Sequence, residues 1–431
     1  MVDETLVFLA AFVTVLFLYS LVSRRIERTV ITAPMVFVAA GLLLGTGGIG
    51  LVTLTVERSL VLLLAETALV LTLFSDASRI NIHALKVSGD LPARLLLLGL
   101  PLTIIAGVIA AVVLLTDLSL LEAAILACLL APTDAALGEA IVTSDKVPLR
   151  IRQALNVEAG LNDGAVIPVL TILWALAVGE ETYALGSGDL FVLALVQIGI
   201  AVLVGGAVGY ACGWVLSRAA EKEWMAHTYE WIALMGIAII AWVLADLLGG
   251  SGFIAAFVAG FATGAVYRQV VTSLIVFTVA EGEVLGHLVF FILGVISYLL
   301  FEHVTFVVLL YAVLSLTVVR MVPVAVSLVA TRLNARTVVF LGWFGPRGLA
   351  SIVLMLTTLE EAGALPGMRT LAAAAVATVM LSVFAHGISA NPAIARYSRH
   401  AGALHDAAPE KEAAADLPTR WGDEATTGPG R

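Results

Sequence analysis

Residues 119–143 read SLLEAAILACLLAPTDAALGEAIVT, an apolar stretch interrupted in its middle by Ala131-Pro132-Thr133-Asp134. As a helix, the stretch is long enough to cross the ~30 Å hydrocarbon core of a bilayer. Proline removes an internal hydrogen bond and disfavours helix at the preceding residue, so we expect the helix to break here. Irregular backbone at membrane depth is tolerated where it lines a cavity. Taken alone, the motif fits a simple proline kink with a capping aspartate better than a functional site.

The whole chain has the composition of a membrane protein. Hydrophobic residues make up 61% of the 431 residues, charged residues make up 13%, and the mean hydropathy is +1.05. Soluble domains contain roughly 45–50% apolar and about 25% charged residues. The net charge of −9 averages over loops and a polar tail, and we expect no nucleic-acid partner. Both cysteines lie in apolar runs, which argues against a disulfide framework or a metal cluster.

Apolar stretches separated by short polar breaks recur along the chain, and a membrane-spanning helix needs ~20 such residues. We predict about thirteen spans, at 5–22, 33–51, 57–75, 92–115, 119–143, 150–178, 190–217, 229–248, 252–267, 283–300, 304–329, 337–358 and 370–390. The expected fold class is therefore an all-α polytopic membrane protein embedded in a lipid bilayer.

Basic residues fall almost entirely in alternate loops and in the C-terminal tail, whereas Arg58 and Arg369 fall in the opposite loops. This asymmetry follows the positive-inside rule and predicts an outside N-terminus and an inside C-terminus. We therefore expect a transmembrane domain at 1–395. The remaining residues, 396–431, lack apolar periodicity and predict a disordered cytoplasmic tail.

Ionisable residues within spans are costly and usually functional. Glu158 lies about 12 Å, and Asp163 about 20 Å, along the helix from the start of their span near residue 150. Asp163 and Asp134 are both expected near the midplane. Their carboxylates, the Thr133 hydroxyl and exposed carbonyls form a hard oxygen site suited to a small alkali cation. A carboxylate in such a site can exchange a proton for a cation.

Arg320 lies about 12 Å deep in the span at 304–329, which is the depth of Glu158. A pair between them avoids leaving either charge buried alone, which costs several kcal/mol. Buried ion pairs can also serve structure only. Several charges of both signs at similar depth make that interpretation weaker.

The stretch Gly342-Trp343-Phe344-Gly345-Pro346-Arg347-Gly348 predicts a second broken helix, in the span at 337–358. The two broken spans are offset by an odd number of spans and run in opposite directions, which is typical of inverted repeats with crossing broken helices. We expect Asp134 to neutralise the half-helix N-termini and Arg347 to neutralise the C-termini. Glu66 lies at a similar depth and either pairs with Arg347 or serves as a packing partner.

These residues resemble the motifs of a known family. The Thr133-Asp134 pair, the Glu158–Asn162-Asp163 spacing and Gly345–Gly348 are similar to those of the electroneutral branch of the monovalent cation/proton antiporters. This branch comprises the NhaP-type sodium/proton antiporters and the animal sodium/proton exchangers. The resemblance covers about residues 5–395.

The resemblance implies that Asp163 binds the cation or the proton, with Asp134 and Thr133 lining the site. Asn162 implies one-for-one exchange, since electrogenic relatives carry a second aspartate there. The resemblance also implies the glutamate–arginine pair described above and a homodimer with a moving core domain. The expected protein is a secondary active transporter, not an enzyme, in a prokaryotic cell membrane, with a role in pH homeostasis and no cofactor. Na⁺ is the expected cation, with Li⁺ and K⁺ as alternatives.

Two residues depart from the family pattern. Ala159 stands where the family often has serine, which removes a hydroxyl ligand and leaves the choice among alkali cations open. Ala135 stands where proline is usual.

Other functions stay open at this point. A symporter of organic anions shares the crossed-helix architecture, but its pocket should contain fewer acids and more Ser, Thr and Asn. A passive cation channel typically has a ring of filter carbonyls, and the chain shows no filter sequence.

Overall fold

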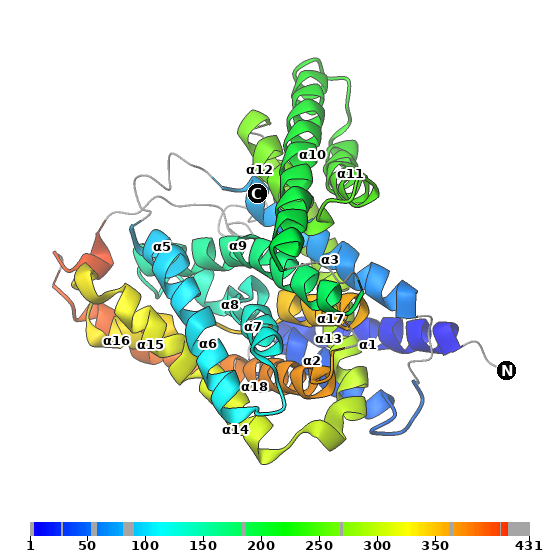
Figure 1. Cartoon of the computed structure of the whole chain (residues 1–431). Coiled ribbons are helices and arrows are strands. Elements are labelled where there is room, and N and C mark those ends of the chain that lie inside the picture. Colours follow the sequence, from blue (N-terminus) through cyan, green and yellow to red (C-terminus); the bar gives the residue numbers. More distant parts are fainter. Residues whose placement is uncertain are drawn as a thin grey trace.

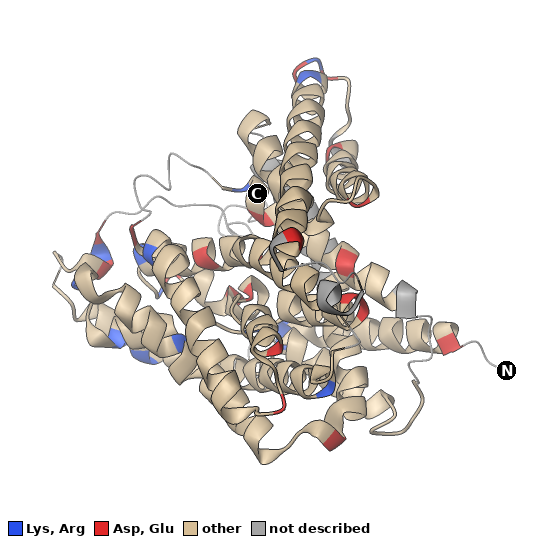
Figure 2. Ribbon diagram, in the orientation of Figure 1, with Lys and Arg blue, Asp and Glu red and all other residues tan. Residues whose placement is uncertain are grey.

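The computed structural model of the chain describes residues 4–26, 29–52, 58–80, 90–182, 187–267, 270–362, 365–405 and 407–412. Every regular element within these ranges is a helix. Nine of the described helical segments are long and apolar enough to cross a membrane. The charged residues lie mostly near helix ends, with long uncharged stretches between them (Figure 2). The prediction of an all-helical, multi-span membrane protein is therefore confirmed.

Each of the thirteen predicted stretches contains described helix, and the count of crossings itself stays a prediction. The uninterrupted long helices are α1 (Glu4–Ile26), α3 (Arg58–Ser78), α9 (Leu149–Thr182), α10 (Ser187–Glu221), α11 (His227–Leu247), α13 (Val270–Ser297) and α18 (Met368–Gly402). The short or composite ones are α2 (Ala33–Leu44), α5 (Asp90–Arg94) joined by a π-helical turn (Leu95–Gly99) to α6 (Leu100–Leu114), α12 (Gly252–Val266), and α14 (Phe306–Leu316) followed by α15 (Val318–Ser327). The broken spans are α7 (Leu120–Leu129) with α8 (Ala135–Val142), and α16 (Ala335–Trp343) with α17 (Leu349–Glu361).

Figure 1 shows the arrangement of the helices, whose contacts fall into two groups that also touch each other through α17 and α3 and through α18 and α2. In one group α12 packs on α3, α10 and α11, and α13 packs on α2 and α3. In the other, α6 packs on α7, α14 and α15, while α18 packs on α14 and α17. Helix α9 contacts α7 and α8 on one side and α3, α10 and α12 on the other, so it lies between the groups.

Glycine allows close packing within the first group. A Cβ at Gly41 of α2 would overlap the carbonyl of Phe291 on α13, and a Cβ at Gly294 would overlap the carbonyl of Val38. The two backbones therefore touch directly, which is how small residues bring membrane helices together.

The start of the predicted tail is ordered. Helix α18 continues to Gly402, and the buried Glu410 accepts hydrogen bonds from the Asn334 amide at 2.7 Å and from Thr337 Oγ1 at 2.9 Å. A carboxylate at the N-terminus of α16 is stabilised there by the helix dipole. Residues 413–431 lie outside the described part of the chain.

Candidate functional site

The first helix break lies between α7 and α8, where the sequence places Pro132. Asp134 is the N-cap of α8: its backbone is extended and its Oδ1 accepts a hydrogen bond from the Ala136 amide at 2.7 Å. An N-cap aspartate satisfies one of the amides that have no partner within their own helix. The prediction of a break at this proline is confirmed.

The second break, between α16 and α17, lies directly against the first. The carbonyl of Pro346 accepts a hydrogen bond from the Asp134 amide at 2.7 Å, and Asp134 Oδ2 accepts one from the Leu349 amide at 2.5 Å. Gly348 permits this contact, because a Cβ there would overlap the Asp134 carboxylate. One carboxylate therefore caps the N-terminal ends of both α8 and α17, as the sequence predicted.

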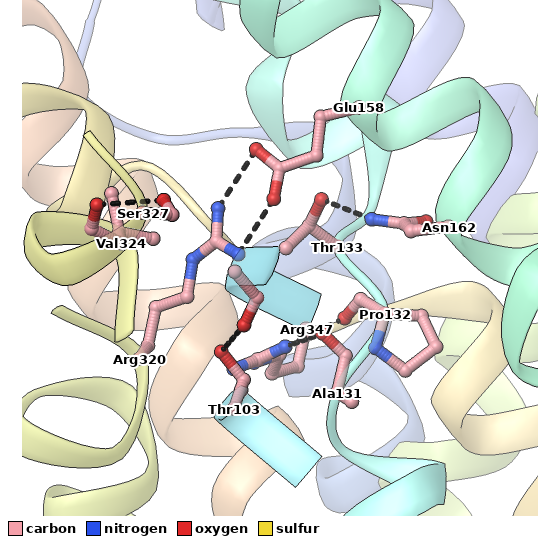
Figure 3. A network of polar contacts seen from close by, with 11 residues as sticks. Thr103, Ala131, Pro132, Thr133, Glu158, Asn162, Arg320, Val324, Ser327 and Arg347 are labelled. Atoms are coloured by element: carbon pink, nitrogen blue, oxygen red, sulfur yellow. Dashed lines mark hydrogen bonds and ion pairs between the residues drawn. The ribbon is translucent and has the colours of Figure 1, made fainter. Parts of the chain in front are cut away.

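Arg347 supplies the opposite charge and is completely buried, with 0% of its surface exposed. Its Nη1 donates to the carbonyl of Ala131 and, at 2.9 Å, to that of Pro132 (Figure 3). These carbonyls follow the end of α7, where a helix accumulates partial negative charge. Arg347 therefore lies at the half-helix C-terminus where the sequence placed it.

Glu66 does not reach Arg347, so the suggested pair between them is wrong. The half-buried Glu66 carboxylate instead accepts a hydrogen bond from Thr357 Oγ1 at 3.3 Å, between α3 and α17. Arg347 Nη1 instead bonds the backbone carbonyls of the first break, which leaves the alternative of a packing partner for Glu66.

Glu158 and Arg320 form the buried ion pair that the sequence predicted. Arg320 Nη1 lies 2.6 Å from Glu158 Oε1 and its Nη2 donates to Oε2 at 2.9 Å, so the pair is bidentate (Figure 3). Each side chain is about 1% exposed. Such geometry is what compensates the cost of desolvating both charges. The pair joins α9 to α15.

The oxygen-rich part of the site lies one helical turn farther along α9. Asn162 Nδ2 donates to Thr133 Oγ1 at 2.6 Å, which ties α9 to the first break (Figure 3). Within the described residues, Asn162 Oδ1 is buried and makes no hydrogen bond. Asp163, the next residue, is also buried. The structure therefore brings Thr133 of the first break against Asn162, the residue before Asp163 on α9.

A comparison with known protein families identifies the chain. Residues 11–396 match the model of the transmembrane sodium/hydrogen exchangers. The chain belongs to this family. Its members are transporters and not enzymes.

Two similar family members are named potassium/proton antiporters. NhaP of Alkalimonas amylolytica is 29% identical over 354 residues, which cover 79% of this chain and 59% of that protein. NhaP2 of Shewanella oneidensis is 27% identical over 247 residues, or 57% of this chain and 41% of that protein. The chain thus spans about half the length of these relatives.

The fold matches that of a solved exchanger. The sodium proton antiporter MjNhaP1 of Methanocaldococcus jannaschii, in its structure at pH 8, superposes with a TM-score of 0.74 over 92% of this chain and all of that one, at 18% identity. A second structure of the same antiporter gives a TM-score of 0.67. At this identity the likeness concerns the fold alone.

Two ionisable groups near these residues, the half-buried Asp76 and the buried His386, were not found from the sequence. Asp76 lies on α3 opposite Gly160, where a Cβ would be 3.7 Å from that of Asp76, one helical turn before Asp163. The predicted span ended at residue 75, whereas α3 continues to Ser78 and carries this acid into the protein. The other group, His386, contacts the second break from α18.

Proposed function

We propose that the protein exchanges a monovalent alkali cation for a proton by secondary active transport. The observation that carries the proposal is the meeting of two broken helices beside buried oxygen atoms. Asp134 and Arg347 neutralise the two breaks. Asp163, a buried acid on α9 next to Asn162, is the group that we propose carries the transported ion.

In this mechanism Asp163 holds either the cation or the proton. Thr133 and Asn162 offer neutral oxygen atoms, and Asp134 adds carboxylate lone pairs beyond its two amide contacts. Asp76, on α3, faces the same stretch of α9 and adds negative charge near the site. Hard oxygen donors of this kind suit alkali cations.

The exchange is proposed to be one for one. Asn162 is neutral, and Glu158 is already matched by the guanidinium of Arg320. If Asp163 alone changes its occupant, then one cation replaces one proton and no net charge crosses the membrane.

The cation is Na⁺ or K⁺ in this proposal. The sequence favoured Na⁺, while the relatives named above are potassium/proton antiporters. Ala159 offers no side-chain ligand beside Glu158, so selectivity has to come from the remaining oxygen atoms. The two helix groups, with α9 between them, supply surfaces that can slide for alternating access. We further propose a homodimer in the cell membrane with its N-terminus outside.

The direct test uses proteoliposomes that contain a quenched pH dye. Pulses of Li⁺, Na⁺, K⁺ and Rb⁺ should each be scored for proton release, with Asp163→Asn as the inactive control. An imposed membrane potential should leave the exchange equilibrium unchanged. Cation flux without proton movement would indicate a channel, and dependence on an added organic anion would indicate a symporter.

A further inference from the structure

His386 is a buried titratable side chain that the proposed exchange does not use. It lies on α18 and is 1% exposed. Its ring stacks on Trp343 with the centroids 5.0 Å apart and meets the Phe344 ring edge-on at 6.4 Å. These aromatic residues flank the point where α16 ends, so the ring is anchored against the second break.

Both ring nitrogens of His386 lie within hydrogen-bond distance of the protein. Nε2 lies 2.8 Å from the carbonyl oxygen of Trp343, the last residue of α16. A carbonyl can only accept, so the ring donates to it. Nδ1 lies 3.0 Å from the Ser382 carbonyl oxygen and 3.2 Å from Ser382 Oγ. The ring therefore connects Ser382, one turn back on its own helix, to the end of α16.

Ser382 extends this contact to the far end of the break. Its Oγ accepts a hydrogen bond from the Arg347 amide at 2.7 Å. A single chain of bonds therefore runs from the Arg347 amide through Ser382 to His386, and from the other ring nitrogen to Trp343. These bonds hold the linker 344–348 near both of its ends, and both holding residues lie on one turn of α18. We call this pair of contacts the clamp.

We infer that His386 and Ser382 are positioning residues that set the linker at 344–348 in the geometry that transport requires. The linker in turn contacts the first break, since Pro346 bonds the Asp134 amide and the Arg347 side chain bonds the Pro132 carbonyl. A shift of the linker would move the Asp134 carboxylate relative to the acid on α9. This role rests on the proposed ion exchange.

The test compares two amide replacements of the histidine. His386→Gln places an amide nitrogen near the position of Nε2 and can keep the bond to Trp343, while Ser382 turns to the carbonyl one helical turn back. His386→Asn places its amide near Nδ1 and loses the Trp343 bond. Ser382→Ala removes the acceptor of the Arg347 amide. Ser389→Ala is the matched control, because it removes the 2.9 Å bond from the Trp343 side chain and a 3.4 Å bond to the His386 carbonyl but leaves the contacts of the imidazole and of the Arg347 amide in place.

We expect His386→Asn and Ser382→Ala to raise the apparent KM for the cation about fivefold or more, as the loss of a buried hydrogen bond implies. His386→Gln and Ser389→Ala should stay within about twofold of the unmodified protein. A purely structural role would lower the amount of folded protein and leave KM unchanged. Equal defects in the Gln and Asn variants, or a normal KM in Ser382→Ala, would overturn the inference.

Hydrogen exchange at the Arg347 amide gives a readout that does not need transport. The amide should lose protection in Ser382→Ala and His386→Asn and keep it in His386→Gln. Unchanged protection in the first two variants would refute the clamp. If the unmodified protein moves no protons with any alkali cation, the proposed function fails. Hydrogen exchange at the Arg347 amide then still decides whether the clamp exists.

Discussion

The two helix breaks look alike in the sequence but are stabilised in different ways. The carbonyls of the first break, after α7, receive their donors from the second: Arg347 bonds Ala131 and Pro132, and Ser351 Oγ bonds Leu129 at 2.7 Å. The Trp343 carbonyl at the second break receives its donors from the Gly345 amide and from the His386 ring on α18. The carbonyls of the first break are therefore compensated mainly by a guanidinium, and the carbonyl of the second break by an amide and an imidazole.

The difference indicates where charge is needed. The first break contains a carboxylate and lies next to the oxygen atoms of Thr133 and Asn162. A guanidinium on the facing break therefore balances Asp134 close to these oxygen atoms.

The largest expected effect comes from removing the exchanging acid while leaving both breaks intact. Asp163→Asn should abolish cation-driven proton release, because the amide can neither bind nor release a proton. The melting temperature in detergent should change little, since the side chain is nearly isosteric. Asp145→Asn, at an exposed acid before α9, is the matched control. Exchange near the normal rate in Asp163→Asn would remove this residue from the centre of the mechanism.

Arg347→Met removes the charged connection between the breaks. It leaves the Ala131 and Pro132 carbonyls without their donor and Asp134 without its balancing charge, so we expect a loss of about 3–5 kcal/mol in unfolding free energy. Exchange should also be lost. Denaturation in detergent measures the change, and Arg152→Met, which breaks a surface pair with Asp145, should cost less than about 1 kcal/mol. Similar losses in both variants would contradict the charged compensation of the first break.

The Glu158–Arg320 pair sharpens the comparison, because it is a buried charge pair outside both breaks. Glu158→Gln and Arg320→Met should each destabilise the protein by about 3 kcal/mol, since either change strands a buried charge. The double variant should be milder than the sum. Thermal melts of the three variants form the cycle. If the two losses simply add, the residues are not energetic partners.

The smallest expected effect is at a neutral contact of the first break. Ser351→Ala removes one hydrogen bond to the Leu129 carbonyl and should cost about 0.5–1.5 kcal/mol. Proton release should continue at a comparable rate. A loss as large as that of Arg347→Met would show that charge is not what distinguishes the donors, and the comparison between the breaks would fail.

Much of the site could be predicted from the sequence, because its signals are local. Proline at 132 and the Gly-Pro-Arg-Gly stretch mark the breaks through backbone chemistry alone. Depth along a helix follows from a fixed rise per residue, which is why Glu158 and Arg320 could be matched. The long apolar stretches, with few charges in each, were sufficient to predict a helical membrane protein.

Other features depended on packing between distant segments. Glu66 and Arg347 were expected at a similar depth in the membrane. Glu66 nevertheless bonds Thr357, and Arg347 bonds the carbonyls of Ala131 and Pro132. Depth along the membrane normal does not determine where a side chain lies within the membrane plane. Asp76 was placed in a loop, since hydropathy falls at the acid although the helix continues.

The sequence by itself therefore determined the class of protein, the positions of the two breaks and the charges that lie near them. Only the tertiary structure decided which donor serves which carbonyl. It alone brought His386, 43 residues along the chain from Trp343, to the carbonyl at the second break. The physical reason is that a buried polar group accepts whichever partner the packed helices bring within about 3 Å. That distance is a property of the packing and is not encoded in any local pattern of residues.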